Sequence, residues 1–537
     1  MKLKEFETDI TPFFDKGLRA DFRNKRNSPA LLGCNNLKPS AWGLSPVEPV
    51  VVPISNEVLS SWSLLLQWPY PRLHRGHKNT FLTSPERLFY VNEGDWSLQQ
   101  MDIYSYATPT DLVTPEVGGL WQLVDFYDTF LFTNGRGCVF HFNLRNALGQ
   151  STPEKVFYSS ALRATAGADF KGRAVLAGFS PDRTWNSKLS SIFALGAKSA
   201  ESGVNFTNLF QGFQDNFVMW STIGGGDLLF WFDENTSFNF NEVGLIQDGS
   251  SGYNSSRPFL LDMIKRNELG WMPLEWPGMI RALKPLGNDL IAYGDGGVSA
   301  LFSNATFGTL GQRKIGLVGI LSEGAVAGDE AEHVYMDKSG TLWSLEAEKL
   351  PVRLGYKEWF QEFIQSEVVI SFNPDQREWY VSNGWKTFVL TKQGLGRSNQ
   401  IVTSTVYHDG QVLGLGTPEA EVEKQASVVT DVFDFGNSLI KTITSIEFSF
   451  TAQFNNVQVA IDYRYSRNQD FQRTLFKSVP EFAQRGFVAF PVAGIEFRLV
   501  MKWADFEQVE PPDQVVVKWK QTDKTNLRSR NAGSVAA

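Results

Sequence analysis

The feature of this sequence that most constrains its fold is a hairpin pattern that recurs between residues 81 and 415. An apolar run with a period of two residues is followed by a Gly, Asn or Asp turn and then by a second short apolar run. The clearest instances begin at Glu86, Trp121, Arg173, Asp227, Asp289, Glu332 and Gln376. Successive starts lie 35, 52, 54, 62, 43 and 44 residues apart. A unit of roughly 40–50 residues built from short strands is typical of a β-propeller blade, and seven starts predict about six to eight blades.

The turn residues support hairpins rather than other connections. Four dipeptides tolerate positive φ at both central positions of a tight turn: Asn134-Gly135, Asp295-Gly296, Asn383-Gly384 and Asp409-Gly410. Two segments, 178–203 and 224–258, interrupt the regular spacing of the hairpins and are interpreted as long inserts within blades. A two-sheet assembly of hairpins is the alternative architecture. One short helix is expected at 356–365, where aromatic residues fall on one side.

The chain divides by pattern into five parts. Residues 1–80 are irregular and proline-spaced, which indicates an arm with an opening strand, and 81–415 form the propeller. Residues 416–427 are charged and free of aromatic residues, as in a linker. From 428 to 523 five or six strands alternate polar and apolar residues, which predicts an antiparallel β-sheet or sandwich. The small, polar residues 524–537 are expected to form a flexible tail. The predicted fold class is therefore all-β.

Charge and cysteine content exclude several function classes. With 50 Lys and Arg against 58 Asp and Glu, the formal charge is −8, which argues against a surface that neutralises phosphates but suits a pore through which DNA slides. Cys34 and Cys138 are too few and too far apart for a disulfide framework or a zinc site. We expect two reduced thiols, no export signal and no membrane-spanning segment.

A search for catalytic groups finds none that outweighs a structural explanation. The five histidines flank no G-x-S-x-G motif; His141 and His333 fall in strands, and His408 begins a tight turn. His74 and His77 lie in a basic stretch with Arg72, Arg75 and Lys78, which is interpreted as a solvated loop.

The sequence gives equally weak evidence for a phosphate-binding loop and for a catalytic pair of carboxylates. The glycines at 224–226 and 315–320 lack the Lys-Ser/Thr of a phosphate-binding loop. Acidic pairs such as Asp329-Glu330 and Glu346/Glu348 are of a kind that any acidic surface supplies. We name no catalytic, cofactor-binding or metal-binding residue, and the protein is predicted not to be an enzyme and to need no cofactor.

Two features keep a carbohydrate-active propeller, either lectin or glycosidase, as an alternative. The turn Asp337-Lys338-Ser339-Gly340-Thr341-Leu342-Trp343 approaches the Asp-box of sialidase propellers but has one residue too many between Asp and Gly. Its interpretation is a structural hairpin closure. Five tryptophans are candidates for a sugar-binding surface but are explained more simply by packing between blades: Trp121, Trp231, Trp343, Trp379 and Trp385.

Three segments resemble the tail nozzle or tail hub proteins of short-tailed bacteriophages, also called packaged-DNA stabilisation proteins. The first is LLGCNNLKPSAWGLSPVEPV (31–50), and the second is WQLVDFYDTFLFTNG (121–135). The third comprises the carboxy-terminal strands at 430–443, 492–503 and 515–528.

The resemblance implies a structural subunit of the virion tail, assembled in the host cytoplasm. The subunits would form a ring, expected to be a hexamer, below the portal and adaptor proteins of the head-to-tail connector. Such a ring would contact tail fibre or tail needle proteins. Genomic DNA would pass along it without sequence recognition, and the ring would close the DNA channel until ejection. No membrane is implied. A tail fibre or fibre-anchoring adaptor is a further alternative, although no repetitive shaft sequence is present.

Overall fold

The structure is a computed structural model of the 537-residue chain. It describes residues 4–20, 29–41, 43–48, 50, 69, 71–92, 97–105, 110–126, 129–142, 155–160, 163–179, 215–221, 223, 270–303, 310–408, 411–416, 423–450, 457–479 and 485–522. The predictions at Asp227, Trp231 and 224–226, the Asp409-Gly410 turn and the tail lie outside the described residues, as do both long inserts apart from Gly178 and Phe179.

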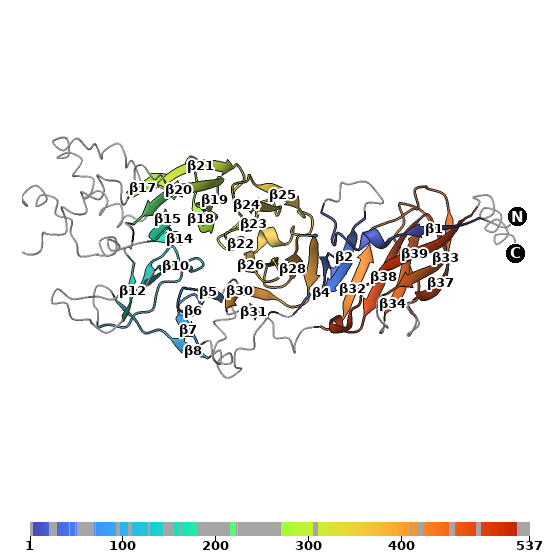
Figure 1. The fold of residues 1–537 in the computed structure, drawn as a ribbon, viewed down its shortest axis with the longest axis horizontal. Helices are drawn as coiled ribbons and strands as arrows, with labels where there is room; N and C mark the ends of the chain where they lie inside the picture. The colour runs from blue at the N-terminus through green and yellow to red at the C-terminus, as the bar shows by residue number, and fades with distance from the viewer. Residues whose placement is uncertain are drawn as a thin grey trace, which may run out of the picture.

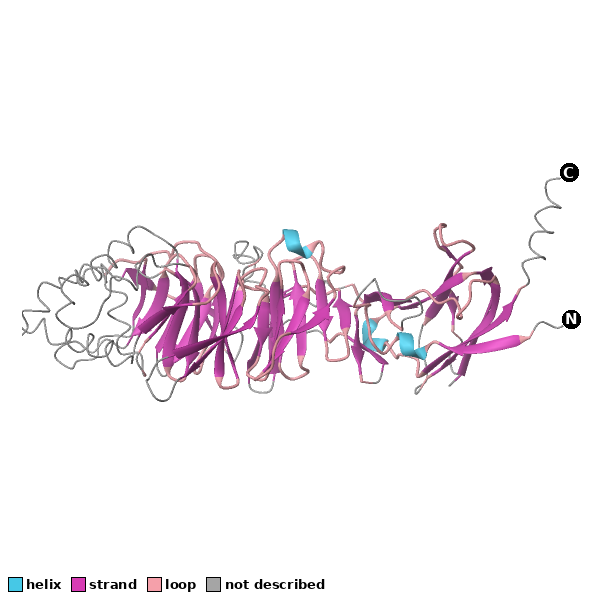
Figure 2. Ribbon diagram, turned by 90° about the horizontal axis from the view of Figure 1, so that it is seen from above, coloured by secondary structure: helices cyan, strands magenta, loops and turns pink. Residues whose placement is uncertain are grey.

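The described strands form two bodies that lie side by side along the long axis of the molecule (Figures 1 and 2). One body is a ring of small antiparallel sheets, and the other is a pair of stacked sheets. Helical structure in the described part consists of short 3-10 turns: η1 (Thr11–Phe13), η4 (Phe363–Gln365) and η6 (Phe506–Gln508). None of them approaches the length and apolar character of a membrane-spanning helix. The all-β prediction is confirmed.

Seven sheets of the described part make up the ring, in chain order around it (Figure 1). Blades 1 to 3 contain β5 (Arg72–Arg75), β6 (Thr80–Thr83), β7 (Leu88–Val91), β8 (Leu98–Gln100); β10 (Gln122–Phe126), β11 (Thr129–Thr133), β12 (Cys138–Phe142), β13 (Lys155–Ser159); β14 (Ala164–Phe170), β15 (Arg173–Phe179), β16 (Phe217–Trp220), β17 (Gly270–Pro273).

Blades 4 to 7 follow in the same manner. They contain β18 (Ile280–Leu286), β19 (Asp289–Gly294), β20 (Val298–Ser303), β21 (Leu310–Gly316); β22 (Val326–Gly328), β23 (Glu332–Met336), β24 (Leu342–Glu346), β25 (Val352–Gly355); β26 (Val369–Asn373), β27 (Glu378–Ser382), β28 (Thr387–Leu390), β29 (Leu395–Ser398); β30 (Val402–His408), β31 (Gln411–Gly416). The count lies within the predicted six to eight.

The first strand of each blade is the innermost one. β10 contacts β14, β14 contacts β18, β22 contacts β26, and β26 contacts β30. β30 in turn contacts β5, so the last blade closes against the first. Because a single blade leaves both faces apolar, closure buries what each blade alone exposes. The fold is a β-propeller with a central channel lined by these inner strands.

Tryptophan N–H groups tie neighbouring blades together. Trp121, before β10, donates from Nε1 to the Ser84 carbonyl of blade 1 at 2.8 Å. Trp379 in blade 6 donates to the Ala327 carbonyl of blade 5 at 3.2 Å. Both indoles are buried. An indole supplies a large apolar surface and one hydrogen-bond donor, so it packs between two sheets and also links them by a hydrogen bond.

The second body is a sandwich of two sheets. One has the order β1-β39-β33-β37, and the other has the order β2-β32-β38-β34-β35, with β36 pairing β34. Their bounds are β1 (Glu5–Asp9), β2 (Leu31–Asn35), β32 (Ala426–Thr430), β33 (Lys441–Ser449), β34 (Gln458–Arg464), β35 (Gln472–Arg473), β36 (Lys477–Ser478), β37 (Arg485–Gly494), β38 (Glu496–Trp503) and β39 (Gln514–Gln521). Alternate residues such as Ile446, Val459 and Leu499 point inward and share one core.

The amino-terminal segment differs from the predicted arm, because it supplies strands to both bodies. β1 pairs with β39 and β2 pairs with β32 in the sandwich. Strands β3 (Leu37–Ser40) and β4 (Gly43–Pro46) then extend blade 6 beyond β29. β9 (Ile103–Ser105) similarly extends blade 2 by pairing with β13. The propeller accordingly begins at Arg72 rather than at residue 81, and β32 begins within the segment interpreted as a linker.

Buried polar contacts hold this segment in place. Asn36 has a φ of 55°, and its Nδ2 donates to the carbonyls of Glu423 at 2.7 Å and Gln425 at 3.1 Å. Lys38 Nζ lies 2.6 Å from Glu378 Oε1 in blade 6, and both side chains are buried. The core cluster that includes Leu31 and Leu37 runs from the sandwich into blades 5 and 6. The two bodies are therefore packed together rather than loosely tethered.

The prediction of a helix at 356–365 is wrong. Residues 357–362 form successive turns, and only Phe363–Gln365 form a 3-10 helix. The aromatic spacing predicts a helical face, but Phe360 and Phe363 instead reach the core beside Phe388. The Phe360 ring meets Phe388 edge-to-face at a centroid distance of 5.1 Å, and the Phe363 ring is tilted against it at 5.7 Å. In this segment the packing of aromatic rings in the core, rather than the local helical spacing of apolar residues, determines the backbone conformation.

Candidate functional site

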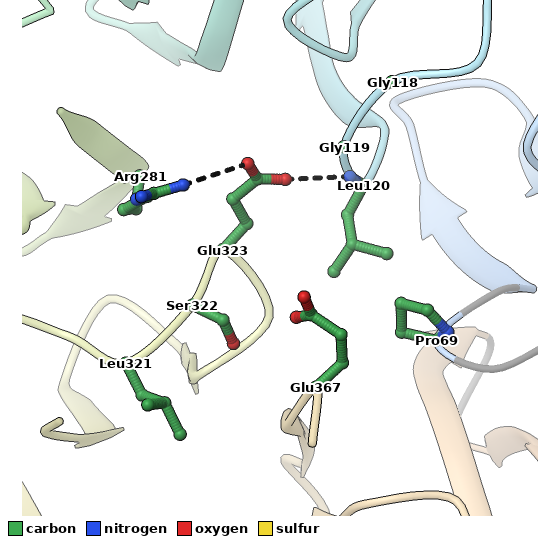
Figure 3. Close-up of a pocket in the computed structure, with 9 residues that line it drawn as sticks. All are labelled: Pro69, Gly118, Gly119, Leu120, Arg281, Leu321, Ser322, Glu323 and Glu367. Carbon is green, nitrogen blue, oxygen red and sulfur yellow. Dashed lines mark hydrogen bonds and ion pairs between the residues drawn. The ribbon is translucent and has the colours of Figure 1, made fainter. Parts of the chain in front are cut away.

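The mouth of the central channel carries a cavity of about 320 Å³ (Figure 3). It is formed largely by the segments that lead into the inner strands of four blades. Its lining residues are Pro69, Gly118, Gly119, Leu120, Arg281, Leu321, Ser322, Glu323 and Glu367. A second cavity of about 300 Å³ adjoins it and shares Gly118, Gly119 and Glu323. Glu323 therefore stands between the two cavities.

The Glu323 carboxyl is held by contacts from two other blades. Its Oε2 accepts a hydrogen bond from the Leu120 backbone N–H at 2.8 Å, and its Oε1 lies 3.8 Å from Arg281 Nη1 (Figure 3). Burial raises the pKa of this carboxyl from 4.5 to about 7, against the opposing effect of the Leu120 hydrogen bond and Arg281. Near neutral pH the group is divided between its acid and carboxylate forms.

Gly119 is required for this geometry. A Cβ at residue 119 would lie 2.2 Å from Glu323 Oε2, which is far inside van der Waals contact. The absence of a side chain lets the backbone of the segment before β10 approach the carboxyl closely enough for the Leu120 N–H to bind it. This approach explains Gly119, whereas a Cβ at Gly118 would instead lie 2.3 Å from the Asn134 carbonyl oxygen.

Arg281 is shared among several acids at the mouth. Its Nε lies 3.2 Å from Asp295 Oδ1, in the turn between β19 and β20, and Lys338 Nζ lies 3.1 Å from the same oxygen. Glu367 projects into the cavity from the segment before β26 (Figure 3). The cavity thus combines two carboxyl groups with a guanidinium, which suits a ligand with several hydroxyl or amide groups.

In the Asp-box-like turn between β23 and β24, the Asp337 carboxylate accepts hydrogen bonds from groups of its own hairpin. Asp337 Oδ1 accepts from the backbone N–H of Ser339 at 2.8 Å and of Thr341 at 3.0 Å, and from Ser339 Oγ at 2.7 Å. Asp337 Oδ2 accepts from Trp343 Nε1 at 2.9 Å. Every one of these contacts closes the turn, so this aspartate has the structural role that the sequence predicted.

The basic stretch interpreted as a solvated loop is instead partly an inner strand. Arg72 and His74 lie in β5, where His74 Nε2 is 3.1 Å from Thr83 Oγ1 and its ring meets that of Phe132 edge-on. Burial holds the pKa of His74 well below its ordinary value. The interpretation failed because a short polar strand has no apolar alternation of its own, so its hydropathy resembles that of a loop. His77 and Lys78 lie in the exposed turn after β5, where the His77 backbone N–H binds Asp125.

The remaining candidates are dispersed over the molecule. His333 is buried in β23, and His141 stacks on Phe130 in blade 2. Asp329 caps its own turn through the Ala331 and Glu332 N–H groups, each at 3.0 Å, and Glu346 pairs with Lys349 on the surface. Cys34 and Cys138 are buried and are not joined in a disulfide. The structure brings none of these residues to the channel mouth.

Of the tryptophans considered for a sugar surface, Trp121 and Trp379 are buried between blades, and Trp343 is bound to Asp337. Trp385 alone of the described four is exposed, at 80%, on the turn between β27 and β28. Glu323, Glu367 and Arg281 were missed by sequence reasoning. Only the Gly118-Gly119 pair gave a local signal, because the three charged residues come from different blades.

No set of three or more His, Cys, Asp or Glu side chains in the described ranges is placed to hold a metal ion. The sequence matches no known family and no curated protein. Solved structures similar to the chain include the surface component PorZ of the Porphyromonas gingivalis type-IX secretion system, with 8% identity and a TM-score of 0.31. That match covers 70% of this chain and 43% of PorZ.

The extracellular domain of a putative one-component system of B. thetaiotaomicron is 10% identical, with a TM-score of 0.32, over 84% of this chain and 50% of that one. An exo-β-1,3-galactanase of Phanerochaete chrysosporium is 9% identical, with a TM-score of 0.25, over 83% and 95%. The chain spans half or less of the length of the first two. At these scores the likenesses carry no argument, and the sheet topology itself defines the class: a β-propeller protein with an attached β-sandwich.

Proposed function

We propose that this chain is a non-enzymatic structural subunit of the tail nozzle, or hub ring, of a short-tailed bacteriophage. The observation that carries the proposal is the placement of the three segments that resemble such proteins. Residues 31–50 supply β2, β3 and β4, which join the two bodies. Residues 121–135 form the β10-β11 hairpin, and the carboxy-terminal segments supply strands of both sandwich sheets. The likeness thus falls on the elements that set the architecture.

The packing between the two bodies supports a mechanical role, in which the subunit transmits force without changing shape. Arg19 Nη1 lies 2.7 Å from Asp431 Oδ2, and Lys38 lies 2.6 Å from Glu378, so buried ion pairs fasten the amino-terminal segment to the sandwich and to blade 6. Buried pairs of this kind fix a unique arrangement even where they add little net stability. A subunit that transmits force between a connector and tail fibres requires such a fixed arrangement.

Exposed apolar side chains on blades 4 and 5 offer a surface for lateral contacts in a ring. Leu317 follows the outer strand β21, and Leu350 and Val352 lie at the start of the outer strand β25, with exposed fractions of 80%, 68% and 59%. β21 and β25 each pair on one side only within the described sheets. Unpaired outer strands with apolar side chains favour association between subunits.

In this proposal six subunits form the ring, and DNA follows the ring axis rather than the channel of each propeller. The portal and adaptor proteins lie above the ring, and tail fibre or needle proteins attach to it. Mass spectrometry and imaging of purified virions test the role. A protein that is absent from particles and monomeric in solution would exclude it.

Ring formation itself is tested on the purified protein. Leu350→Glu combined with Val352→Glu should reduce the assembled species in native mass spectrometry, because two charges enter the apolar contact. Leu475→Glu is the control, since Leu475 is 87% exposed but lies in the sandwich. Unchanged assembly of the double variant would exclude blades 4 and 5 as the lateral surface.

The cavity at the channel mouth favours a second candidate, a carbohydrate-binding or carbohydrate-cleaving propeller. Glu323, with a pKa of about 7, and Glu367 lie in one cavity with Arg281. A carboxyl that is partly protonated near neutral pH beside a second carboxyl is the pairing used in glycoside hydrolysis. Glycan-array binding or hydrolysis that disappears in Glu323→Gln would support this candidate, and a lack of both would remove it.

A further inference from the structure

One sheet of the sandwich, β1-β39-β33-β37, is open at both edges. Within the described residues β1 pairs only with β39, and β37 pairs only with β33, so the two strands form opposite edges of the sheet (Figure 1). All three pairings in this sheet are antiparallel, and β1 and β37 therefore run in opposite directions. A second copy rotated about an axis along the strands would present its β1 antiparallel to β37. The sheet would then continue from one copy into the next.

A backbone hydrogen bond shows which groups of β1 point to the open edge. The Ile10 N–H donates to the Val515 carbonyl, next to β39, at 2.9 Å. The bonding direction alternates along an antiparallel strand, so the N–H and C=O groups of Glu5, Glu7 and Asp9 point away from β39. The side chains of these three residues are also exposed. The open edge of β1 is thus formed by three acidic residues.

The open edge of β37 has a different character. The Ala489 carbonyl accepts a hydrogen bond from Lys477 Nζ at 2.6 Å, so it points away from β33. By the same alternation the backbone groups of Phe487 point to the open edge, and this residue is 55% exposed. After Ala489 the register with β33 shifts, and Pro491, which has no N–H, follows. The regular edge is therefore Arg485–Ala489, which matches the five-residue length of β1.

We propose that copies of this chain join edge to edge, with β37 of one copy pairing with β1 of the next. Head-to-tail contacts of this kind close into a ring. The inference rests on the ring proposed above, in which this pairing is a second lateral contact. Opposing Glu7 of the next copy to Phe487 aligns the two five-residue stretches. In that register Glu5 of the next copy lies opposite Ala489, where the Lys477 ammonium can bind its carboxylate.

Charge favours this pairing over two-fold pairing of identical edges. If β1 paired with β1 of a second copy, carboxylates would lie opposite carboxylates, which destabilises a strand pair. If β37 paired with β37, Lys477 would approach a stretch, Arg485–Ala489, that contains no acid. Only the head-to-tail pairing brings the acidic edge to the cation and to the exposed ring of Phe487.

Disulfide cross-linking of the full chain tests the pairing. The Cα atoms of directly opposed residues in antiparallel strands lie about 5.5 Å or less apart, which a disulfide can span. In a mixture of Glu7→Cys and Phe487→Cys, mild oxidation should give covalent dimers that contain one chain of each variant, as identified by mass spectrometry. The natural protein is the control, since Cys34 and Cys138 are buried. Dimers of like chains in place of mixed dimers would overturn the proposal.

A non-covalent measurement compares two substitutions of Glu7. Glu7→Pro removes an N–H that points away from β39, so the sheet should be retained, as circular dichroism would verify. Association in native mass spectrometry should nevertheless weaken about tenfold, because one acceptor of β37 loses its donor. Glu7→Ala is the matched control, since it keeps the N–H and should assemble nearly as the natural protein does. Equal association of the two variants would contradict edge pairing.

The outcomes separate this inference from the proposed function. A ring in purified virions without mixed cross-links would refute edge pairing and leave the tail role intact. Mixed cross-links in a protein that is absent from virions would refute the tail role and leave edge pairing intact. A chain that is monomeric, forms no mixed cross-links and is absent from particles would refute both.

Discussion

Replacing Asp337 tests whether the Asp-box-like turn is a structural closure. The Asp337 carboxylate accepts four hydrogen bonds in the β23-β24 hairpin and is only 5% exposed. In Asp337→Ala these donors lose their acceptor. Ser339 can rebind water because it is partly exposed, but Thr341 is buried and Trp343 is half-buried.

The expected cost follows from that difference. A buried donor left without an acceptor costs about 1–3 kcal/mol, so the Thr341 and Trp343 N–H groups together predict a loss of about 2–6 kcal/mol in Asp337→Ala. Asp337→Asn retains the oxygen that serves the backbone but presents an N–H to Trp343 Nε1, which predicts a smaller loss of about 1–2 kcal/mol. Adding Trp343→Phe to Asp337→Asn should recover part of it, because the opposed donors are removed.

Urea unfolding followed by tryptophan fluorescence and near-ultraviolet circular dichroism measures these differences. Asp375→Ala is the control, because Asp375 is an exposed turn residue of blade 6 and should change the free energy of unfolding by less than about 0.5 kcal/mol. If Asp337→Ala costs no more than this control, the hydrogen bonds of the turn do not stabilise the blade and our account of the motif is wrong.

Three further predictions concern buried groups. Lys38→Met should lower the free energy of unfolding in urea by about 3–5 kcal/mol, because the Glu378 carboxylate loses its ion pair. Adding Glu378→Gln should recover most of this loss, and equal stability of the single and the double variant would contradict the prediction. The folded pKa of Glu323 is about 7 against an ordinary 4.5, so this group's stabilisation is present below pH 4.5 and is lost as the pH rises through 7. The difference, about 2.5 pKa units, corresponds to at most about 3 kcal/mol, and urea titrations across this range should show the loss in the natural protein but not in Glu323→Gln. Burial raises the pKa of Cys34 and Cys138 to about 12, so a thiol-specific disulfide reagent should label them only after denaturation, and rapid labelling of the folded chain would contradict their placement.

Local sequence signals predicted the blade hairpins well. The Asn134-Gly135 and Asn383-Gly384 turns fall between paired strands, with glycine φ values of 79° and 85°. In both turns the asparagine Oδ1 accepts backbone N–H groups two and three residues later. Such turns depend on four adjacent residues, so the sequence alone specifies them.

The amino-terminal segment and the basic stretch around His74 were misread for a common reason. Leu37 pairs with Arg397, and β5 closes the ring against β30, so their strand conformation depends on partners more than 300 residues away. A short polar strand has no periodic apolar pattern of its own. Its assignment requires knowledge of what lies opposite it.

The sequence by itself determined that the chain is all-β, that hairpins recur at a blade-like spacing and that a distinct sheet region follows, because turn preference and strand alternation are local properties. Tertiary structure decided the closure of the ring, the course of the amino-terminal strands through both bodies and the groups that meet in the channel. Glu323 meets the Leu120 N–H across 203 residues of sequence, and Arg72 reaches Gly324 across the ring. These contacts arise from the packing of separate blades, which no local pattern encodes.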